Sequence, residues 1–244
     1  MRSFRLGRVG ATPWIVWGFV RRHGRRTYKR TARAAIRRVH VARHGGASVG
    51  DLSAVRTREQ IPDVLNRRGL VGAGVEVGVK RGAYSEFLLR HWRGRTLISV
   101  DPWREAPTDE YLDRANVEQE EQESYYTETR RRLARFGTRS DVWRTTSVEA
   151  AGRVADASLD FVYIDARHDR ESVLEDLATW FPKLRPGAIF AGHDYADGEF
   201  PNGVFGVKSA VDDFFGERGI RVHATDGGPR VVEHFASWLV EIPG

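Results

Sequence analysis

The stretch that most constrains the fold is Asp160–Tyr195, in which two apolar runs flank an amphipathic helical pattern. Phe161–Ile164 is typical of a strand buried on both faces, and it is followed by Asp165. A second apolar run, Ala188–Ala191, precedes Gly192–Tyr195. The helical pattern between them forms one apolar stripe, at Val173, Leu174, Leu177, Trp180 and Phe181. This order predicts a βαβ unit whose two parallel strands end at the same edge of a sheet.

Four polar residues follow these two strands, namely Asp165, His168, His193 and Asp194. Ligands of open parallel sheets bind beyond the carboxyl ends of the strands, so we expect these side chains to share a site. The alternatives are structural. Asp165 could cap the following helix, His168 could lie on the surface of the first helical turn, and His193 and Asp194 could hold a loop by hydrogen bonds.

A second strand–helix–strand pattern precedes this unit. Val71–Val77 is an apolar strand containing Glu76, Ala83–Trp92 has helical spacing, and Thr96–Val100 is a strand followed by Asp101. Gly78 and Gly82 lie in the first turn, where glycines let a ligand approach the backbone N–H groups of a helix start. Asp101 is placed to hold the two hydroxyls of a ribose. A plain tight turn and a capping role for Asp101 are the alternatives.

The glycine spacing between strand and helix is G-x-x-x-G rather than the G-x-G-x-x-G of dinucleotide-binding proteins, which argues against a nicotinamide-dependent enzyme. The remaining patterns predict these elements: a helix that starts at the Thr57–Gln60 capping box, a long solvated helix within Pro102–Gly137, a strand at Val142–Thr145, a helix at Ser147–Val154, a glycine-bearing loop at Ala196–Val207, a helix at Ser209–Arg218, and paired antiparallel strands at Ile220–Ala224 and Val231–Ile242. The predicted fold class is α/β, with a doubly wound, mostly parallel, seven-stranded sheet.

The positive charge of the chain is concentrated at its start. Residues 1–45 contain 13 Arg or Lys and no acid, whereas the remainder contains 26 basic and 33 acidic residues. We therefore divide the chain into a basic helical arm, residues 1–50, and a domain, residues 51–244. The apolar Pro13–Val20 is far shorter than the roughly 20 residues that span a bilayer. The amphipathic Arg25–His44 suits a membrane surface or nucleic acid, or else a solvated tail or a cap on the domain.

The sequence contains no cysteine, which excludes disulfide frameworks, zinc–thiolate sites and thiol catalysis. The cytoplasm is the simplest compartment, with peripheral membrane contact through the arm as the alternative. Whether the chain forms a homo-oligomer is left open by the sequence.

Three motifs together resemble class I S-adenosylmethionine-dependent methyltransferases: EVGVKRGAYS from Glu76, ISVDPW around Asp101, and DFVYIDARHDRESVLEDL with LRPGAIFAGHDY. The nearest branch is the bacterial small-molecule group that includes the macrolide-sugar O-methyltransferases. The resemblance covers about residues 71–240 and omits the arm. It implies methyl transfer from S-adenosylmethionine to a hydroxyl of a small molecule.

The resemblance also implies roles for single residues. Glu76 and Gly78 would contact the methionine part of the cofactor and Asp101 its ribose, and Ser147 would lie near the adenine. Gly82 and Asp165 would also bind the cofactor. Asp165 and Asp194 match positions that hold a divalent ion in metal-dependent members, and His168 matches a general base. His193 stands where relatives often carry a carboxylate. An imidazole suits manganese or another transition metal better than magnesium.

The chemistry agrees with this set of residues. The sulfonium methyl group is already activated, so the enzyme aligns the donor and the acceptor. A metal lowers the pKa of the hydroxyl, and a nearby base takes its proton. Two rival functions fit the same residues: a hydroxylase-like relative with the same cofactor pocket, and a non-catalytic binding protein tethered by the arm to a membrane or to nucleic acid.

Overall fold

The computed structural model describes residues 50–107, 113, 116–200, 203–226 and 235–244, and the structural account concerns these residues. Contacts separate the chain into the units Met1–Ala47 and Ser48–Gly244, and the described residues belong to the second. The interpretation of the basic arm, including its amphipathic helix, therefore lies outside the described residues. No helix in the described part combines the length and apolarity needed to cross a membrane.

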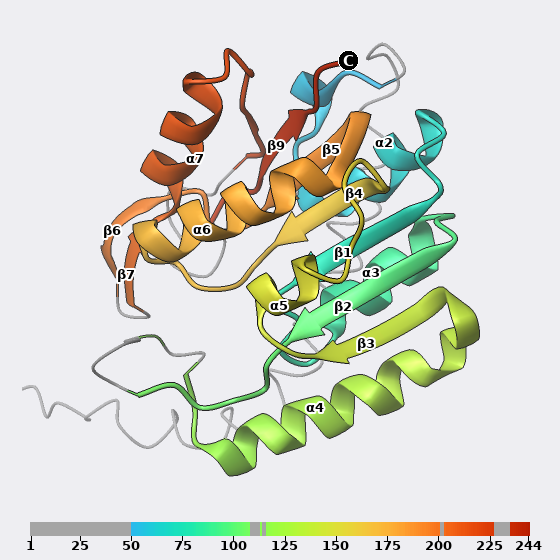
Figure 1. Ribbon diagram of the computed structural model, residues 1–244, viewed down its shortest axis with the longest axis vertical. Helices are drawn as coiled ribbons and strands as arrows, with labels where there is room; N and C mark the ends of the chain where they lie inside the picture. Colours follow the sequence, from blue (N-terminus) through green and yellow to red (C-terminus); the bar gives the residue numbers. More distant parts are fainter. Residues whose placement is uncertain (1–49, 108–112, 114–115, 201–202, 227–234) are drawn as a thin grey trace, which may run out of the picture. The chain divides into compact units, whose positions relative to one another are not determined.

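A seven-stranded sheet of order β3-β2-β1-β4-β5-β9-β8 forms the centre of the domain (Figure 1). The first five strands of this order pair in parallel, whereas β9 is antiparallel to both β5 and β8. The strands are β1 Ala73–Val77, β2 Thr96–Asp101, β3 Ser140–Arg144, β4 Leu159–Ile164, β5 Leu184–Gly192, β8 His223–Ala224 and β9 Trp238–Glu241. The predicted mostly parallel, doubly wound α/β fold is confirmed.

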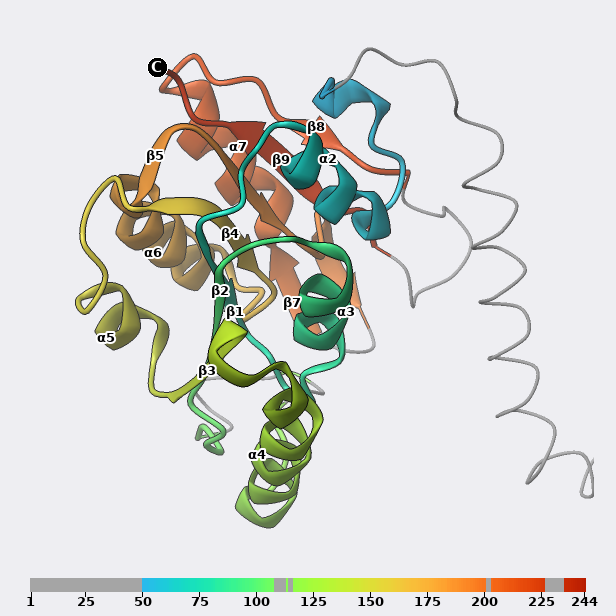
Figure 2. The ribbon, with the colours of Figure 1, turned by 90° about the vertical axis from the view of Figure 1, so that its right-hand side faces the viewer.

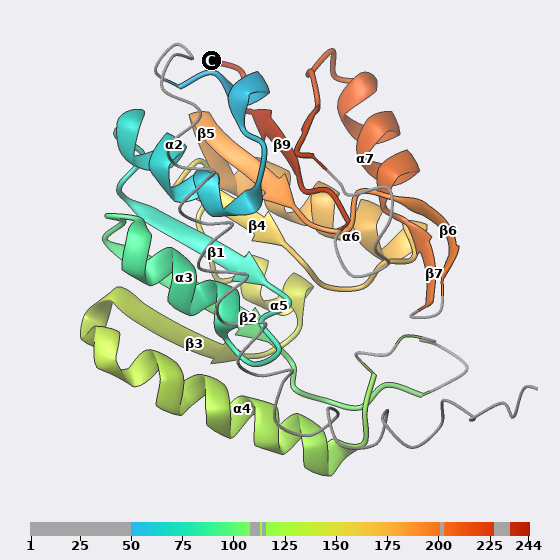
Figure 3. The same cartoon turned by 180° about the vertical axis from the view of Figure 1, so that it is seen from behind.

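Helices cover both faces of this sheet. α2 (Ile61–Arg67) and α3 (Ala83–His91) lie on one face, and α5 (Ser147–Ala151), α6 (Arg170–Trp180) and α7 (Val207–Gly216) lie on the other (Figure 2). Seen from behind, α4 (Gln119–Leu133) runs beside α3 (Figure 3). Short 3₁₀ helices are η1 Leu52–Ala54, η2 Arg58–Gln60, η3 Ala134–Arg139 and η4 Phe181–Lys183.

Strand β4 shows why Phe161–Ile164 is an uninterrupted apolar run. Successive side chains of a strand point to opposite faces of the sheet. Phe161 and Tyr163 pack in the cluster that contains α2 and α3, whereas Val162 and Ile164 pack in the cluster that contains α5, α6 and α7. All six residues of β4 are buried, as expected for a central strand covered on both faces.

Strand β5 begins earlier than predicted, at Leu184 rather than Ala188. Its pairing with β4 is irregular, because Leu159 pairs with Leu184 but Phe161 pairs with Ile189. Pro186 has no backbone N–H to donate. It lies in this irregular stretch, where no regular ladder of hydrogen bonds needs that donor. The apolar run Ala188–Ala191 therefore marked only the regular part of β5.

The segment predicted as a loop, 196–207, contains an antiparallel hairpin. β6 (Asp197–Phe200) pairs with β7 (Gly203–Gly206). The prediction of a plain loop is wrong because the glycines lie within or beside the strands. The late strands are shorter than predicted, although their antiparallel pairing is confirmed. Residues 227–234, which include the start of the strand predicted at Val231–Ile242, lie outside the described residues.

Candidate functional site

A cavity of about 1000 Å³ lies at the carboxyl ends of the parallel strands, where the strand order reverses between β1 and β4. Its walls contain residues that follow five strands. The site residues expected from the sequence that line it are Glu76, Gly78, Asp101, Ser147, Asp165, His168 and Asp194. Gly82 and His193 are not among its lining residues. The shared hollow predicted for Asp101, Asp165 and Asp194 is thus present.

The glycine turn packs directly against the end of β4. Gly78 has φ of 84°, and a Cβ at this position would lie 2.0 Å from the carbonyl oxygen of Asp165. Gly82, with φ of 67°, precedes α3, and its Cβ would lie 3.0 Å from Cγ2 of Thr129. The missing side chain of Gly78 therefore makes room for the neighbouring strand end. This close approach brings the first turn and Asp165 together.

Glu76 is a buried acid in the cavity wall, only 1% exposed. Burial raises the pKa of its carboxyl to about 8, although a hydrogen bond from Ser85 Oγ opposes the rise. The hydroxyl oxygens of Ser85 and Ser99 lie 2.9 Å apart. Glu76 is thus fixed by a buried hydroxyl pair and keeps a proton over much of the neutral range.

Asp101 is held by backbone amides at the end of β2. Its Oδ2 accepts hydrogen bonds from the N–H groups of Val79 (3.0 Å) and Lys80 (2.8 Å), and Oδ1 accepts one from Trp103 (2.8 Å). Burial raises the pKa of Asp101 while these bonds oppose the rise. Asp101 therefore has the capping role that was the structural alternative, because it holds the turn after β1. The same carboxylate also lines the cavity.

Ser147 belongs to a buried network beyond β3. Its hydroxyl donates to Asp176 Oδ1 and accepts from Trp180 Nε1 at 2.8 Å. Burial raises the pKa of Asp176 to about 7, and Asp176 also lines the cavity. Sequence reasoning missed Asp176. The available signal was an acid at a position on the apolar stripe of the predicted helix, next to Leu177.

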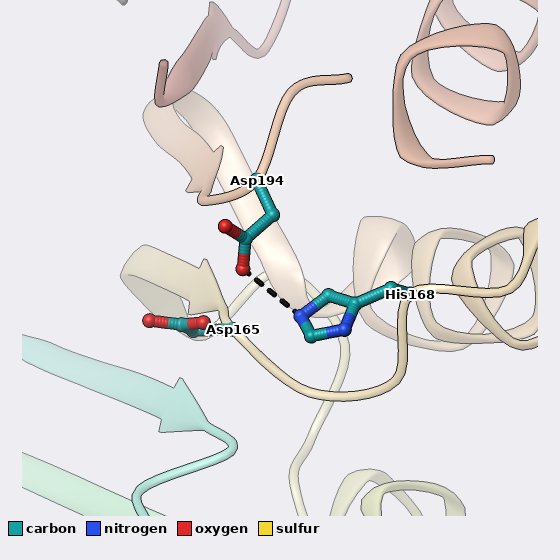
Figure 4. A group of neighbouring side chains, drawn as sticks. All are labelled: Asp165, His168 and Asp194. Carbon is teal, nitrogen blue, oxygen red and sulfur yellow. Dashed lines mark ion pairs between the residues drawn. The ribbon is translucent and has the colours of Figure 1, made fainter. Parts of the chain in front are cut away.

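Asp165, His168 and Asp194 form a cluster in which one potential ligand atom of each residue lies within 4.8 Å of the others (Figure 4). His168 Nε2 lies 2.9 Å from Asp194 Oδ2. His193 Nδ1 lies 2.9 Å from the other oxygen, Oδ1, of Asp194. The metal ligands expected from the sequence were Asp165, Asp194 and His193. The structure brings His168, rather than His193, together with the two carboxylates. His193 orients Asp194 from outside this group.

The structural alternatives for two of these residues are wrong. The residue that caps α6 is Asp169, which accepts a hydrogen bond from the N–H of Ser172 at 2.9 Å, rather than Asp165. His168 precedes α6, and its side chain is only 12% exposed. The side chains of Asp165 and His168 instead line the cavity.

His168 is clamped between two elements that sequence reasoning did not connect with it. Its Nδ1 lies 2.7 Å from Oδ2 of Asp113, and its ring stacks on Phe205 of β7 with 4.2 Å between ring centres. Asp113 belongs to the polar segment before α4 and also bridges to Gly203. No local pattern marks Asp113, because its partners lie far away in the sequence.

The charges in this cluster favour a protonated imidazole. Burial alone would lower the pKa of His168, but its hydrogen bonds to Asp113 and Asp194 raise it to about 10. Burial raises the pKa of Asp165, whereas for Asp194 it is outweighed by the bonds from His168 and His193, which lower the pKa. In this arrangement His168 favours its protonated form, unlike the general base that the resemblance implies, and Asp165 is more readily protonated than Asp194.

The comparisons with known proteins concern the segment that contains most of these residues. Residues 75–195 match the family model described as a methyltransferase domain. Residues 75–195 are thus a methyltransferase domain by this match. This domain contains the glycine turn, Asp101 and the cluster of Asp165, His168 and Asp194.

Solved methyltransferases share the fold of this domain. A putative rRNA methylase from Clostridium thermocellum is 15% identical, with a TM-score of 0.55, covering 78% of this chain and 97% of that one. A putative O-methyltransferase from Klebsiella pneumoniae is 17% identical, with a TM-score of 0.54 and coverages of 86% and 97%. The O-methyltransferase from Bacillus cereus in complex with SAH is 13% identical, with a TM-score of 0.52 and coverages of 90% and 91%. At these identities the likeness establishes the fold.

A curated relative, the uncharacterized protein y4gI of Sinorhizobium fredii (strain NBRC 101917 / NGR234), is 36% identical over 55 residues. The match covers 22% of this chain and 6% of the relative, so it spans only a small part of that protein.

Proposed function

We propose that this methyltransferase domain transfers a methyl group from S-adenosylmethionine to a hydroxyl of a small molecule. The observation that carries the proposal is the single cavity into which five strand ends bring acids, glycines and an imidazole. Its volume of about 1000 Å³ lies at the upper end of the range for small-molecule sites. Such a cavity has room for a nucleoside cofactor and a second small molecule.

The cofactor would lie along the first three strand ends. Glu76 and the glycine turn would face its methionine part, and Asp101 its ribose hydroxyls. Ser147 and the neighbouring Asp176 would face the adenine. The acceptor would lie at the other end, next to Asp165 and His168, where its oxygen can reach the methyl group in line with the sulfur.

Asp165 and His168 are the proposed catalytic pair. Since His168 already carries a proton in this arrangement, it would donate a hydrogen bond to the acceptor oxygen and stabilise the negative charge that develops there. Asp165, whose pKa is raised by burial, would take the proton of the hydroxyl. The sulfonium carbon–sulfur bond then breaks as the carbon–oxygen bond forms.

The cluster also fits a divalent cation, because two carboxylates and one imidazole are a donor set that suits manganese or another transition metal. Asp165, His168 and Asp194 would hold the ion, with His193 orienting Asp194. Binding of the ion would displace the proton of His168, because a ligating imidazole is neutral. A bound ion would lower the pKa of the acceptor hydroxyl. We expect a chelator to lower activity and Asp165→Asn to abolish both activity and Mn²⁺ binding measured by electron paramagnetic resonance. Full activity in the chelator would refute a required metal.

The experiment that tests the proposed function measures product mass. The protein is incubated with S-adenosylmethionine and a panel of hydroxyl-bearing sugars and polyketides, with Asp165→Asn as the inactive control. A methyl group that replaces hydrogen adds about 14 Da, whereas oxygenation adds about 16 Da. We expect the first value. A gain of about 16 Da, or a protein that does not bind S-adenosylmethionine, would contradict the proposal.

A further inference from the structure

Arg58 reaches the cavity from outside the region that matches the methyltransferase family model, residues 75–195. It is the first residue of η2, and its backbone carbonyl accepts a hydrogen bond from the Tyr84 hydroxyl at 3.1 Å. Its guanidinium lies 4.8 Å from the centre of the Tyr84 ring. Tyr84 is itself buried in the core, so it holds both the backbone and the side chain of Arg58 in place.

The guanidinium of Arg58 hydrogen-bonds with the side chain of Tyr163 and pairs with Asp165, contacts that do not use all five of its N–H donors. Among the described residues its one ion pair is with Asp165, through Nη1 to Oδ2 at 3.3 Å. The side chain is 32% exposed and lines the cavity. A guanidinium carries five N–H donors in a planar fork that matches the two oxygens of a carboxylate. Arg58 therefore presents donors to the cavity that a bound anion can use.

The surroundings of Arg58 select a ligand group that carries both charges. Glu76, Asp165 and Asp194 line the same cavity, and their carboxyl oxygens can accept hydrogen bonds from an ammonium group. Two other cationic side chains of the cavity wall are engaged elsewhere: Arg81 pairs with Glu128 and stacks on Tyr125, and Arg167 pairs with Asp169. An amino-acid end, with an ammonium and a carboxylate on one carbon, matches acids beside one arginine.

We propose that Arg58 binds the carboxylate of the amino-acid end of the cofactor. This inference rests on the proposed function, because S-adenosylmethionine supplies such an end. The adjacent acids would accept hydrogen bonds from the ammonium group. The segment before the family-matched region thus completes the cofactor site.

Comparing the affinities of three nucleoside ligands isolates the contribution of the carboxylate to binding. The ligands are S-adenosylhomocysteine, its decarboxylated analogue, and 5′-methylthioadenosine, which lacks the amino-acid end. Charged hydrogen bonds contribute enough for the wild type to prefer S-adenosylhomocysteine over the decarboxylated analogue by roughly 10- to 100-fold. Isothermal titration calorimetry measures the three dissociation constants. In Arg58→Met this preference should fall to within about threefold, while the affinity for 5′-methylthioadenosine is unchanged. Arg58→Lys should lie between the two, since lysine keeps the charge but loses the fork.

Arg104→Met is the matched control, because Arg104 also lines the cavity but is exposed and follows β2. It should keep the wild-type preference. An Arg58→Met protein that binds 5′-methylthioadenosine normally and keeps the full preference would overturn the inference alone. A wild type that binds none of the three nucleosides would overturn the proposed function and this inference with it. If Arg58→Met does not fold, a wild-type preference retained in Arg58→Lys overturns the inference, and a reduced one supports it.

Discussion

At the scale of single residues, the site depends on how closely the Gly78 turn approaches Asp165. Gly78→Ala should lower the free energy of unfolding by more than about 3 kcal/mol, because a Cβ meets the Asp165 carbonyl oxygen at 2.0 Å and φ is positive. Gly69→Ala is the control, since Gly69 also has positive φ but has nothing within 4 Å of its Cβ. It should cost only about 1 kcal/mol in urea denaturation. Equal costs at the two positions would show that the close approach is not present.

Asp176 makes a second residue-scale prediction, which concerns pH. Its pKa is raised to about 7 in the folded protein, so the folded state binds this proton more tightly than the unfolded chain does. The stability from this group is therefore present at low pH and is lost as the pH rises from about 4 through 7, by roughly 1.4 kcal/mol per pH unit.

Asp176→Asn removes this titration. The free energy of unfolding of the wild type minus that of Asp176→Asn should thus fall by a few kcal/mol between pH 4 and 8. Glu217→Gln, at a side chain that is 78% exposed, should leave the pH profile unchanged. A wild type and an Asp176→Asn protein with parallel profiles would contradict the raised pKa.

The sequence predicted the site residues that follow apolar runs, because a parallel sheet brings the residues after its strands to one edge. Asp101 and Asp165 belong to this class. Asp113 and Arg58 do not, because their positions depend on contacts with residues 55 and 107 positions away in the chain. No local periodicity carries that information.

At the scale of secondary-structure elements, the side chain of Arg139 in η3 caps the C-terminal end of helix α3. Its guanidinium donates to the carbonyls of Leu89 (3.0 Å), Trp92 (2.7 Å) and Gly94 (3.1 Å). The last carbonyls of a helix lack partners within the helix, so these bonds satisfy groups that would otherwise need water. Arg139→Met should lower the free energy of unfolding by about 2 kcal/mol in urea denaturation. Arg131→Met, at an exposed position of α4, should change it by less than about 0.5 kcal/mol. A cost for Arg139→Met no larger than this would refute the capping role.

The elements that the sequence predicted well are those with a strong period. α6 and α7 carry one apolar face each, and β4 is apolar from Phe161 to Ile164. The β6–β7 hairpin escaped prediction because its strands are short and contain exposed residues such as Val204, 61% exposed. Its Phe205 is instead positioned by stacking on His168, which is a long-range contact.

At the scale of the whole domain, the sheet is covered on both faces and its carboxyl edge carries the chemistry. The reversal of strand order between β1 and β4 opens the cavity, and Asp101, Asp165 and Asp194 meet there because β2, β4 and β5 are parallel. The proposed cofactor site therefore depends on the parallel order of these strands. Loss of a strand-end acid should weaken cofactor binding without unfolding the sheet.

Calorimetric titration of the protein with S-adenosylhomocysteine tests this account most directly. We expect saturable binding at one site per chain, and a dissociation constant at least about tenfold higher for Asp101→Ala, because the ribose hydroxyls lose a charged acceptor. Thermal unfolding checks that Asp101→Ala is folded. Absence of binding by the wild type, or an undiminished affinity in folded Asp101→Ala, would contradict the account.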